Sequence, residues 1–367
     1  MKTMLVNVQF LRFVAAAMVL LYHAAQGIGK ELGVDNPLRD VFMLIGFSGV
    51  DLFFVISGFI IYASNQNNTG SHQAVQFISL RTARIFLGYW PFFFIAWGML
   101  YYLNEEKLEK INLVSSFFLI PDKVHATLIN VTWSLSYELY FYGLFFVLFF
   151  LKNRLRIIMI AAATIIVFNV FANYVFEAYT WKGFNNISST IRFIASPWLL
   201  EFFAGCVVAH MIGKGTKAGA WLSVAAGITL FALGYLLNAT VIDGKMDKFF
   251  NCHYRMCCFG IGSALLIYGL VNLEQRGFVI FSRFSMLLGG ASYSLYLCHA
   301  IILDAIAYST LQQSLINLAL PPTLKYIALL LVIQVVAVLL YLGVEKPVYT
   351  RSKQWIYAMN AQRKAAV

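Results

Sequence analysis

The chain has 367 residues, of which 60% are hydrophobic, 16% aromatic and only 12% charged. Soluble globular domains carry about 25% charged residues, so this composition excludes an ordinary soluble protein and predicts an all-α, polytopic membrane protein. The net charge of +11 arises from bases scattered between apolar segments, which favours control of membrane orientation and argues against nucleic-acid binding.

About ten segments have the roughly 20 mainly apolar residues that a membrane span needs. They are residues 8–27, 41–63, 84–103, 131–151, 157–176, 194–213, 220–238, 254–272, 286–308 and 324–344. No Gly/Ser-rich linker, low-complexity tract or internal repeat separates them. We therefore expect a single integral-membrane domain over residues 1–367, a helical bundle with a short cytoplasmic tail from about residue 346.

The orientation of this bundle follows from the distribution of Lys and Arg, which accumulate on the cytoplasmic side of membrane proteins. With both termini cytoplasmic, the loops on that side contain only two acids, Glu274 and Glu345. The bases on that side are Lys2, Arg81, Arg84, Lys152, Arg154, Arg156, Lys214, Lys217, Arg276, Arg283, Lys346, Arg351, Lys353, Arg363 and Lys364. We expect a multi-pass protein of the cytoplasmic (inner) membrane.

The first segment contains two ionisable residues, Arg12 and His23, within LRFVAAAMVLLYHA. Eleven residues of α-helix make about three turns and rise roughly 16 Å, so both lie on one face with Arg12 near a membrane surface. An ionisable group within a span costs at least a few kcal/mol unless it is paired or hydrated, which makes it a functional hypothesis. The alternative is that His23 only forms an interhelical packing contact.

Four further acids lie within predicted spans at similar depth, which predicts a shared polar cavity. They are Asp51, Glu138, Glu201 and Asp304. Asp51 follows three small residues, Gly46, Ser48 and Gly49, that permit close helix packing. It is expected either to orient His23 or to pair with an Arg or Tyr.

Two other groups of residues suggest binding sites. Arg81 and Arg84, three residues apart before the third span, match the geometry of phosphate groups, although they could simply anchor the span. Glu138 lies among Trp133, Ser136 and Tyr137, which could hold a sugar by stacking and hydrogen bonding.

The cysteines predict no metal site. Cys252, Cys257 and Cys258 lie close to His253, but a C-x4-C-C arrangement lacks the spacing of zinc ligands. No metal and no permanently bound cofactor are therefore expected.

Five sequence segments occur in an order that resembles the membrane-bound acyltransferase 3 family. They are LRFVAAAMVLLYHA, GVDLFFVISGFII, FISLRTARIFLGYW, TWSLSYELYFY and SYSLYLCHA, and the resemblance extends from Leu11 to the EKP at Glu345–Pro347. Members of this family O-acylate extracytoplasmic glycans with acyl-CoA. The resemblance implies an O-acyltransferase, most simply an O-acetyltransferase, whose partners are acetyl-CoA or another acyl-CoA, a carbohydrate acceptor and the lipid bilayer. A homo-oligomer remains open.

The resemblance implies a role for each candidate residue. His23 is the general base, since an imidazole accepts and returns protons near neutral pH. Asp51 and Glu138 are the carboxylates that could orient it. Arg81 and Arg84, with Arg12 as a further candidate, bind the phosphates of CoA, while Trp133, Ser136 and Tyr137 contact the acceptor. Direct attack by the acceptor hydroxyl and prior acylation of the protein are both compatible with the sequence.

The main alternative is a proton-coupled transporter, because intramembrane His, Asp and Glu residues also form proton relays. Carriers built from inverted repeats have matching helices interrupted by Gly or Pro in their two halves, and this sequence has none. A transporter also gives no special reason for the Arg81 and Arg84 pair. The sequence therefore favours the acyltransferase.

Overall fold

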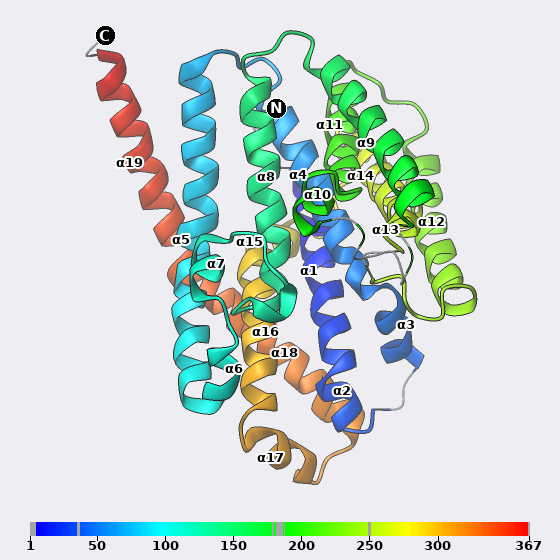
Figure 1. Cartoon of the computed structure of the whole chain (residues 1–367), viewed down its shortest axis with the longest axis vertical. Helices are drawn as coiled ribbons and strands as arrows, with labels where there is room; N and C mark the ends of the chain where they lie inside the picture. The colour runs from blue at the N-terminus through cyan, green and yellow to red at the C-terminus, as the bar shows by residue number, and fades with distance from the viewer. Residues whose placement is uncertain are drawn as a thin grey trace. The chain divides into compact units, whose positions relative to one another are not determined.

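The computed structural model describes residues 5–34, 37–177, 180, 186, 188–248 and 251–365. All regular secondary structure in these residues is helical (Figure 1). The predicted all-α class is therefore confirmed.

Eight helical segments of the described chain are long and apolar enough to cross a membrane. A ninth span forms if the broken pair Ser282–Gly290 and Ser292–Ala307 is counted together. These segments match nine of the ten predicted spans. The remaining one, 131–151, contains α8 (Trp133–Leu148), whose 16 residues rise only about 24 Å, against roughly 30 Å of hydrocarbon. The protein is thus a multi-pass membrane protein, with eight or nine segments in its described residues that are able to span a membrane, while the placement of its termini stays a prediction.

The chain folds into two compact units, each built from three stretches of sequence. Unit 1 comprises Met1–Tyr22, Pro37–Asn67 and Asn153–Gly289, and unit 2 comprises His23–Asn36, Asn68–Lys152 and Gly290–Val367. The division falls within α1 (Val6–Gln26), so that His23 belongs to unit 2. Whether the two units form the single domain expected from the sequence stays a prediction.

Unit 1 contains the first part of α1 and most of the helices of the middle of the chain. These are α3 (Pro37–Ile45), η1 (Gly46–Ser48), α4 (Gly49–Asn65), α9 (Arg154–Phe176), α10 (Ser189–Ile194), α11 (Trp198–Gly213), α12 (Ala220–Thr240), α13 (Cys252–Arg255), η6 (Met256–Gly260), α14 (Ile261–Glu274) and α15 (Ser282–Gly290). The η6 segment is a π-helix, a form found mostly as single turns inside longer helices.

The start of α1 is fixed by a carboxylate from α14. The backbone N–H groups of Val6 and Asn7 each donate to Glu274 at 2.8 Å. The first N–H groups of a helix have no partner within it, and the helix dipole favours a negative charge there. Glu274, one of only two acids expected on the cytoplasmic side, therefore serves as the N-terminal cap of α1.

Glycines bring α4 against α11. A Cβ atom at Gly58 would overlap the carbonyl oxygen of Phe202, and one at Gly205 would overlap the carbonyl oxygen of Val55. Each glycine therefore lets the backbone of one helix contact that of the other. Small residues at such contacts are the usual means of packing helices in membranes.

The predicted close approach at the start of α4 is confirmed. A Cβ atom at Gly49 would overlap the carbonyl oxygen of Ala15, and one at Gly46 would lie 2.6 Å from the carbonyl oxygen of Met18. Ala15 and Met18 lie on α1, so these two glycines bring the entry to α4 against that helix.

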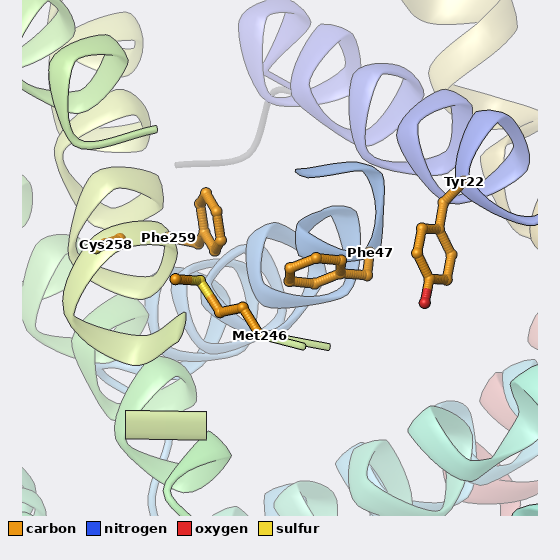
Figure 2. Close-up of a cluster of buried hydrophobic side chains, with 5 residues drawn as sticks. All are labelled: Tyr22, Phe47, Met246, Cys258 and Phe259. Carbon is orange, nitrogen blue, oxygen red and sulfur yellow. The ribbon is translucent and has the colours of Figure 1, made fainter. Parts of the chain in front are cut away.

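An apolar cluster beside this contact consists of Tyr22, Phe47, Met246, Cys258 and Phe259, all buried. Figure 2 shows the Phe47 ring between Tyr22 and Phe259. The rings make edge contacts, with centroids 5.7 Å apart for Tyr22 and Phe47 and 5.8 Å for Phe47 and Phe259. The cluster joins η1, α1 and the π-helix η6 and covers one side of a buried ion pair described below.

Unit 2 contains the end of α1 and the remaining helices. These are α2 (Ile28–Glu31), α5 (Ser71–Leu103), α6 (Glu105–Glu109), α7 (Leu113–Phe118), η2 (Val124–Ala126), η3 (Asn130–Thr132), α8, α16 (Ser292–Ala307), α17 (Leu311–Asn317), α18 (Pro322–Leu340), η7 (Tyr341–Glu345) and α19 (Lys346–Ala365). In Figure 1 the long α5, in cyan, runs beside the green α8. The η7 segment, like η6, is a π-helix.

Gly88 sets the contact between α5 and α16. A Cβ atom there would lie 2.7 Å from the ring of Tyr293, and the Tyr293 hydroxyl donates to the carbonyl oxygen of Ile85 at 2.9 Å. The missing side chain at Gly88 therefore allows an aromatic residue of the SYSLYLCHA segment to dock against α5, next to Arg84.

Candidate functional site

His23 forms a hydrogen-bonded pair with a second histidine. Its Nδ1 atom lies 3.2 Å from Nε2 of His299 on α16, and the ring centroids are 5.2 Å apart. His23 is partly buried, whereas His299 is fully buried. The structure thus joins two sequence segments, LRFVAAAMVLLYHA and SYSLYLCHA, that lie 276 residues apart.

His299 is held in turn by its own helix. Its Nδ1 atom lies 2.9 Å from the carbonyl oxygen of Leu295. A carbonyl oxygen only accepts hydrogen bonds, so Nδ1 of His299 carries the hydrogen. Both ring nitrogens of this buried imidazole therefore have partners, as a buried polar group requires.

The adjoining turn of α16 is fastened to the segment that precedes α8. The Tyr296 hydroxyl donates to the carbonyl oxygen of Val131 at 2.8 Å and lies 2.7 Å from the hydroxyl of Ser134. All three residues are buried. A second pair of motifs, TWSLSYELYFY and SYSLYLCHA, thus meets in the same unit as His23.

The predicted acceptor-binding residues lie on the first turns of α8. Ser136 donates its hydroxyl to the carbonyl oxygen of Leu119 at 2.8 Å. The ring of Tyr137 packs edge-on against Trp133, with centroids 6.1 Å apart. Ser136 and Tyr137 are buried, while Trp133 is partly exposed. Contact with an acceptor stays a prediction for all three residues.

Arg81 and Arg84 lie on α5, ten and thirteen residues after its start at Ser71. The Arg81 guanidinium is 5.8 Å from the centroid of the Tyr142 ring, and that of Arg84 is 5.1 Å from the centroid of the Tyr349 ring. Both residues are partly buried. The aromatic rings support flat guanidinium groups at a distance suited to cation–π attraction.

Two carboxylates stand close to this pair of arginines. Glu138 accepts a hydrogen bond from the Tyr142 hydroxyl, and Glu345 accepts one from the Ser294 hydroxyl at 2.6 Å. The charges of both carboxylates act on Arg84. Glu138, predicted to orient His23 or to bind the acceptor, thus lies with Tyr142 and the arginines, while Nδ1 of His23 is bonded to His299.

Asp51 pairs with an arginine, one of the two roles expected for it. Its Oδ2 atom lies 2.6 Å from Nη2 of Arg255, and its Oδ1 atom accepts from Nε at 3.2 Å. This two-point contact is fully buried, and the Phe47 ring lies 4.8 Å from the guanidinium. Glu201, which is also buried, interacts electrostatically with both Asp51 and Arg255. The three ionisable groups belong to unit 1.

Arg12 is also in unit 1, on α1 as predicted. It donates from Nη1 to the side-chain oxygen of Gln9 at 3.2 Å. Whether it contacts CoA stays a prediction.

Asp304, another acid predicted within a span, forms an ion pair near the end of α16. Its Oδ2 atom lies 3.0 Å from Nζ of Lys107 on α6, which also lies 4.7 Å from the Tyr308 ring centroid. Burial lowers the pKa of Lys107, but the charge of Asp304 and the Tyr308 hydroxyl outweigh it, so the net shift is upward. This contact ties α6 to α16.

Arg255 is the residue of the buried ion pair that sequence reasoning missed. It lies within the predicted span 254–272, and the reasoning applied there to acids and histidines would have identified it. Glu345 was counted only as a cytoplasmic acid, and nothing in the sequence linked it to Arg84. Among the residues that the structure describes, no three His, Cys, Asp or Glu side chains are arranged to hold a metal ion.

Comparison with known proteins provides independent evidence about the chain. A family model described as an acyltransferase domain matches residues 5–342. The chain is also 27% identical over 348 residues to the exopolysaccharide production protein ExoZ of Rhizobium meliloti (strain 1021), an alignment that covers 91% of this chain and 96% of that protein. No solved structure matches the chain.

Proposed function

The chain belongs to the acyltransferase 3 family, and from that premise we propose that this membrane acyltransferase moves an acyl group, most simply acetyl, from cytoplasmic acyl-CoA to a hydroxyl of an extracytoplasmic polysaccharide. The relative named as an exopolysaccharide production protein aligns over nearly its whole length. Its name supports a polysaccharide as the acceptor. The apolar helices and the distribution of Lys and Arg support the cytoplasmic (inner) membrane as the location.

The observation that carries the proposal is the hydrogen bond between His23 and His299. Transfer from a thioester to a hydroxyl needs a base that takes the hydroxyl proton, and imidazole is suited to this near neutral pH. We assign that role to His23. In direct transfer, the acceptor oxygen forms a bond to the acyl carbon, the carbon–sulfur bond breaks, and the proton taken by His23 passes to the CoA sulfur.

Arg81 and Arg84 are the proposed site for the phosphates of CoA. Both are partly buried arginines of one helix in the unit that contains His23. A guanidinium group presents a planar set of donors that fits phosphate oxygens. The pantetheine arm of CoA would extend from there toward His23, while the acceptor approaches from the extracytoplasmic side.

Deletion of the gene tests the activity. We expect the exopolysaccharide of the deletion strain to be made and exported but to lose ester-linked acyl groups, measured by NMR of the purified polymer. Membranes containing the protein should also transfer label from acetyl-CoA to the polymer. A polymer with unchanged acylation would contradict the proposal, and one that accumulates inside the cell would favour a transporter.

The donor site predicts a loss of acyl-CoA binding in the double variant Arg81→Ala/Arg84→Ala. Two charge-assisted contacts, at about 1.5–3 kcal/mol each, correspond to a Kd that rises at least roughly a hundredfold. Calorimetry on the purified protein measures this directly.

Arg351 provides a matched control for the double variant, because it is an exposed base on α19 of the same unit. Arg351→Ala should leave the Kd unchanged. The double variant Arg81→Lys/Arg84→Lys keeps the charges but loses the planar fork, so we expect an intermediate Kd. An unchanged Kd in the alanine double variant would leave both arginines as anchors of α5.

A further inference from the structure

The contact between Nε2 of His299 and Nδ1 of His23 determines which ring nitrogen of His23 can accept a proton. We propose that His299 is a positioning residue: it holds His23 in the tautomer that carries its hydrogen on Nδ1, so that Nε2 is the proton-accepting atom. This inference rests on the proposed role of His23 as the base. It further assigns His299 as the residue that orients His23, and Nε2 of His23 as the atom that takes the proton.

The first step is the hydrogen on His299. Its Nδ1 atom faces the carbonyl oxygen of Leu295 at 2.9 Å, and this contact requires Nδ1–H. A neutral imidazole has one N–H group and one lone pair. His299 is fully buried, and a second proton would place a cation there beside His23, so the neutral form is favoured. Its Nε2 atom is therefore an acceptor.

The second step is the position of the hydrogen on His23, which follows from the tautomer of His299. Because Nε2 of His299 is an acceptor, the 3.2 Å contact requires that Nδ1 of His23 carries the hydrogen and donates it. The lone pair of a neutral His23 then lies on Nε2. The backbone of Leu295 thus selects, through two imidazoles, the nitrogen of His23 that takes a proton.

The same chain assists the proton transfer itself. When Nε2 of His23 takes the acceptor proton, the ring becomes an imidazolium that still donates from Nδ1 to His299. A hydrogen bond from a charged donor is roughly twice as strong as one between neutral groups, so His299 stabilises the state formed during catalysis. His299 cannot exchange roles with His23, because its only lone pair points at His23.

The placement of His299 does not depend on this contact alone. One helical turn earlier, Tyr296 is bonded to Val131 and Ser134, which holds α16 against the start of α8. Its ring centroid lies 6.0 Å from that of His299. The acceptor atom is therefore held in position before any substrate arrives, which is what an orienting group requires.

The test compares two substitutions of His299. His299→Leu keeps the apolar bulk but removes the acceptor, whereas His299→Gln keeps a side-chain oxygen able to accept from Nδ1 of His23. Loss of a group that sets the tautomer of a catalytic histidine costs up to about 10⁴-fold. We expect His299→Leu to lower kcat at least tenfold with an unchanged KM for acyl-CoA, and His299→Gln to recover most of the rate.

A second measurement determines the tautomer of His23 without relying on enzymatic activity. Nitrogen-15 NMR of protein labelled at histidine distinguishes Nδ1–H from Nε2–H, and His23 should carry its hydrogen on Nδ1 in the wild type. In His299→Leu that preference should weaken or reverse. His23→Asn assigns the signal.

The outcomes separate this inference from the proposed function. If the wild-type protein shows the Nδ1–H signal on His23 but no acyl transfer, the proposed function is contradicted while the positioning role of His299 is supported. An active wild type with Nε2–H on His23 would overturn the positioning role, as would equal losses in the Leu and Gln variants or an active Leu variant. If His299→Leu fails to fold, the wild-type spectrum and the rate of His299→Gln still decide.

Discussion

Replacing His23 with Gln is expected to lower the rate of acyl transfer by about 10²–10⁴-fold, the usual loss when a general base is removed. Glutamine has similar bulk and can still hydrogen-bond between helices, but it takes no proton near neutral pH. The rate is measured as label transferred from acetyl-CoA to polysaccharide by the purified protein. The melting temperature and acyl-CoA binding should stay near their wild-type values.

His23→Asn is the sharper companion to this variant. The amide nitrogen of Asn occupies nearly the place of Nδ1, so it preserves the hydrogen bond to His299 while removing Nε2. If His23 serves only as a packing residue, Asn or Gln should support transfer within a few-fold of wild type. Substantial acylation by either variant would end the assignment of His23 as the base.

Removing both carboxylates beside Arg255 is expected to destabilise the protein strongly. Arg255 is 3% exposed and pairs with Asp51, and the buried Glu201 interacts electrostatically with both. A buried charge that loses its partner costs about 3–5 kcal/mol. We expect the double variant Asp51→Asn/Glu201→Gln to lose about this much free energy of unfolding, measured in mixed micelles.

The single variants should cost much less than the double. Two buried carboxyl groups beside one guanidinium are compatible when they share a proton, so Gln at position 201 can imitate a protonated Glu201. In Asp51→Asn, Glu201 can give up that proton and pair with Arg255. Each single change is then expected to cost about 1 kcal/mol, with a coupling of about 0.5–3 kcal/mol between them. Strict additivity would show that Glu201 does not substitute for Asp51.

The sequence predicted the helical class and most of the spans because hydropathy reports directly on burial in lipid. It overestimated the length of the helix in segment 131–151, where the apolar run is longer than the helix. Residues 131 and 132 belong to the short η3, and α8 ends at Leu148. It also missed the first thirteen residues of α5, before residue 84, since a polar helical extension carries no hydropathy signal.

For the candidate site, the sequence identified single residues better than their partners. An ionisable residue within an apolar segment can be recognised from the sequence alone, which is how His23 and Asp51 were identified. Their partners, His299 and Arg255, lie 276 and 204 residues away, and pairing at such separation depends on packing that one sequence does not reveal. A carboxylate was expected to orient His23 on chemical grounds, and the structure places the imidazole of His299 within hydrogen-bonding distance of its Nδ1 atom.

The π-helix η7 has a consequence for chain length near the C-terminus. A π turn closes i→i+5 hydrogen bonds and so holds one residue more than an α turn. Loss of one residue from Tyr341–Glu345 would convert the π turn to an α turn and leave the helix beyond it in place. Loss of one residue from the regular helix at 346–348 would instead rotate everything beyond it by about 100° about the helix axis. In that second case Tyr349 would leave the Arg84 guanidinium, whereas Glu345, which precedes the deletion, would keep its hydrogen bond with Ser294. The rotation of α19 about its own axis, rather than its composition, therefore decides whether Tyr349 contacts Arg84.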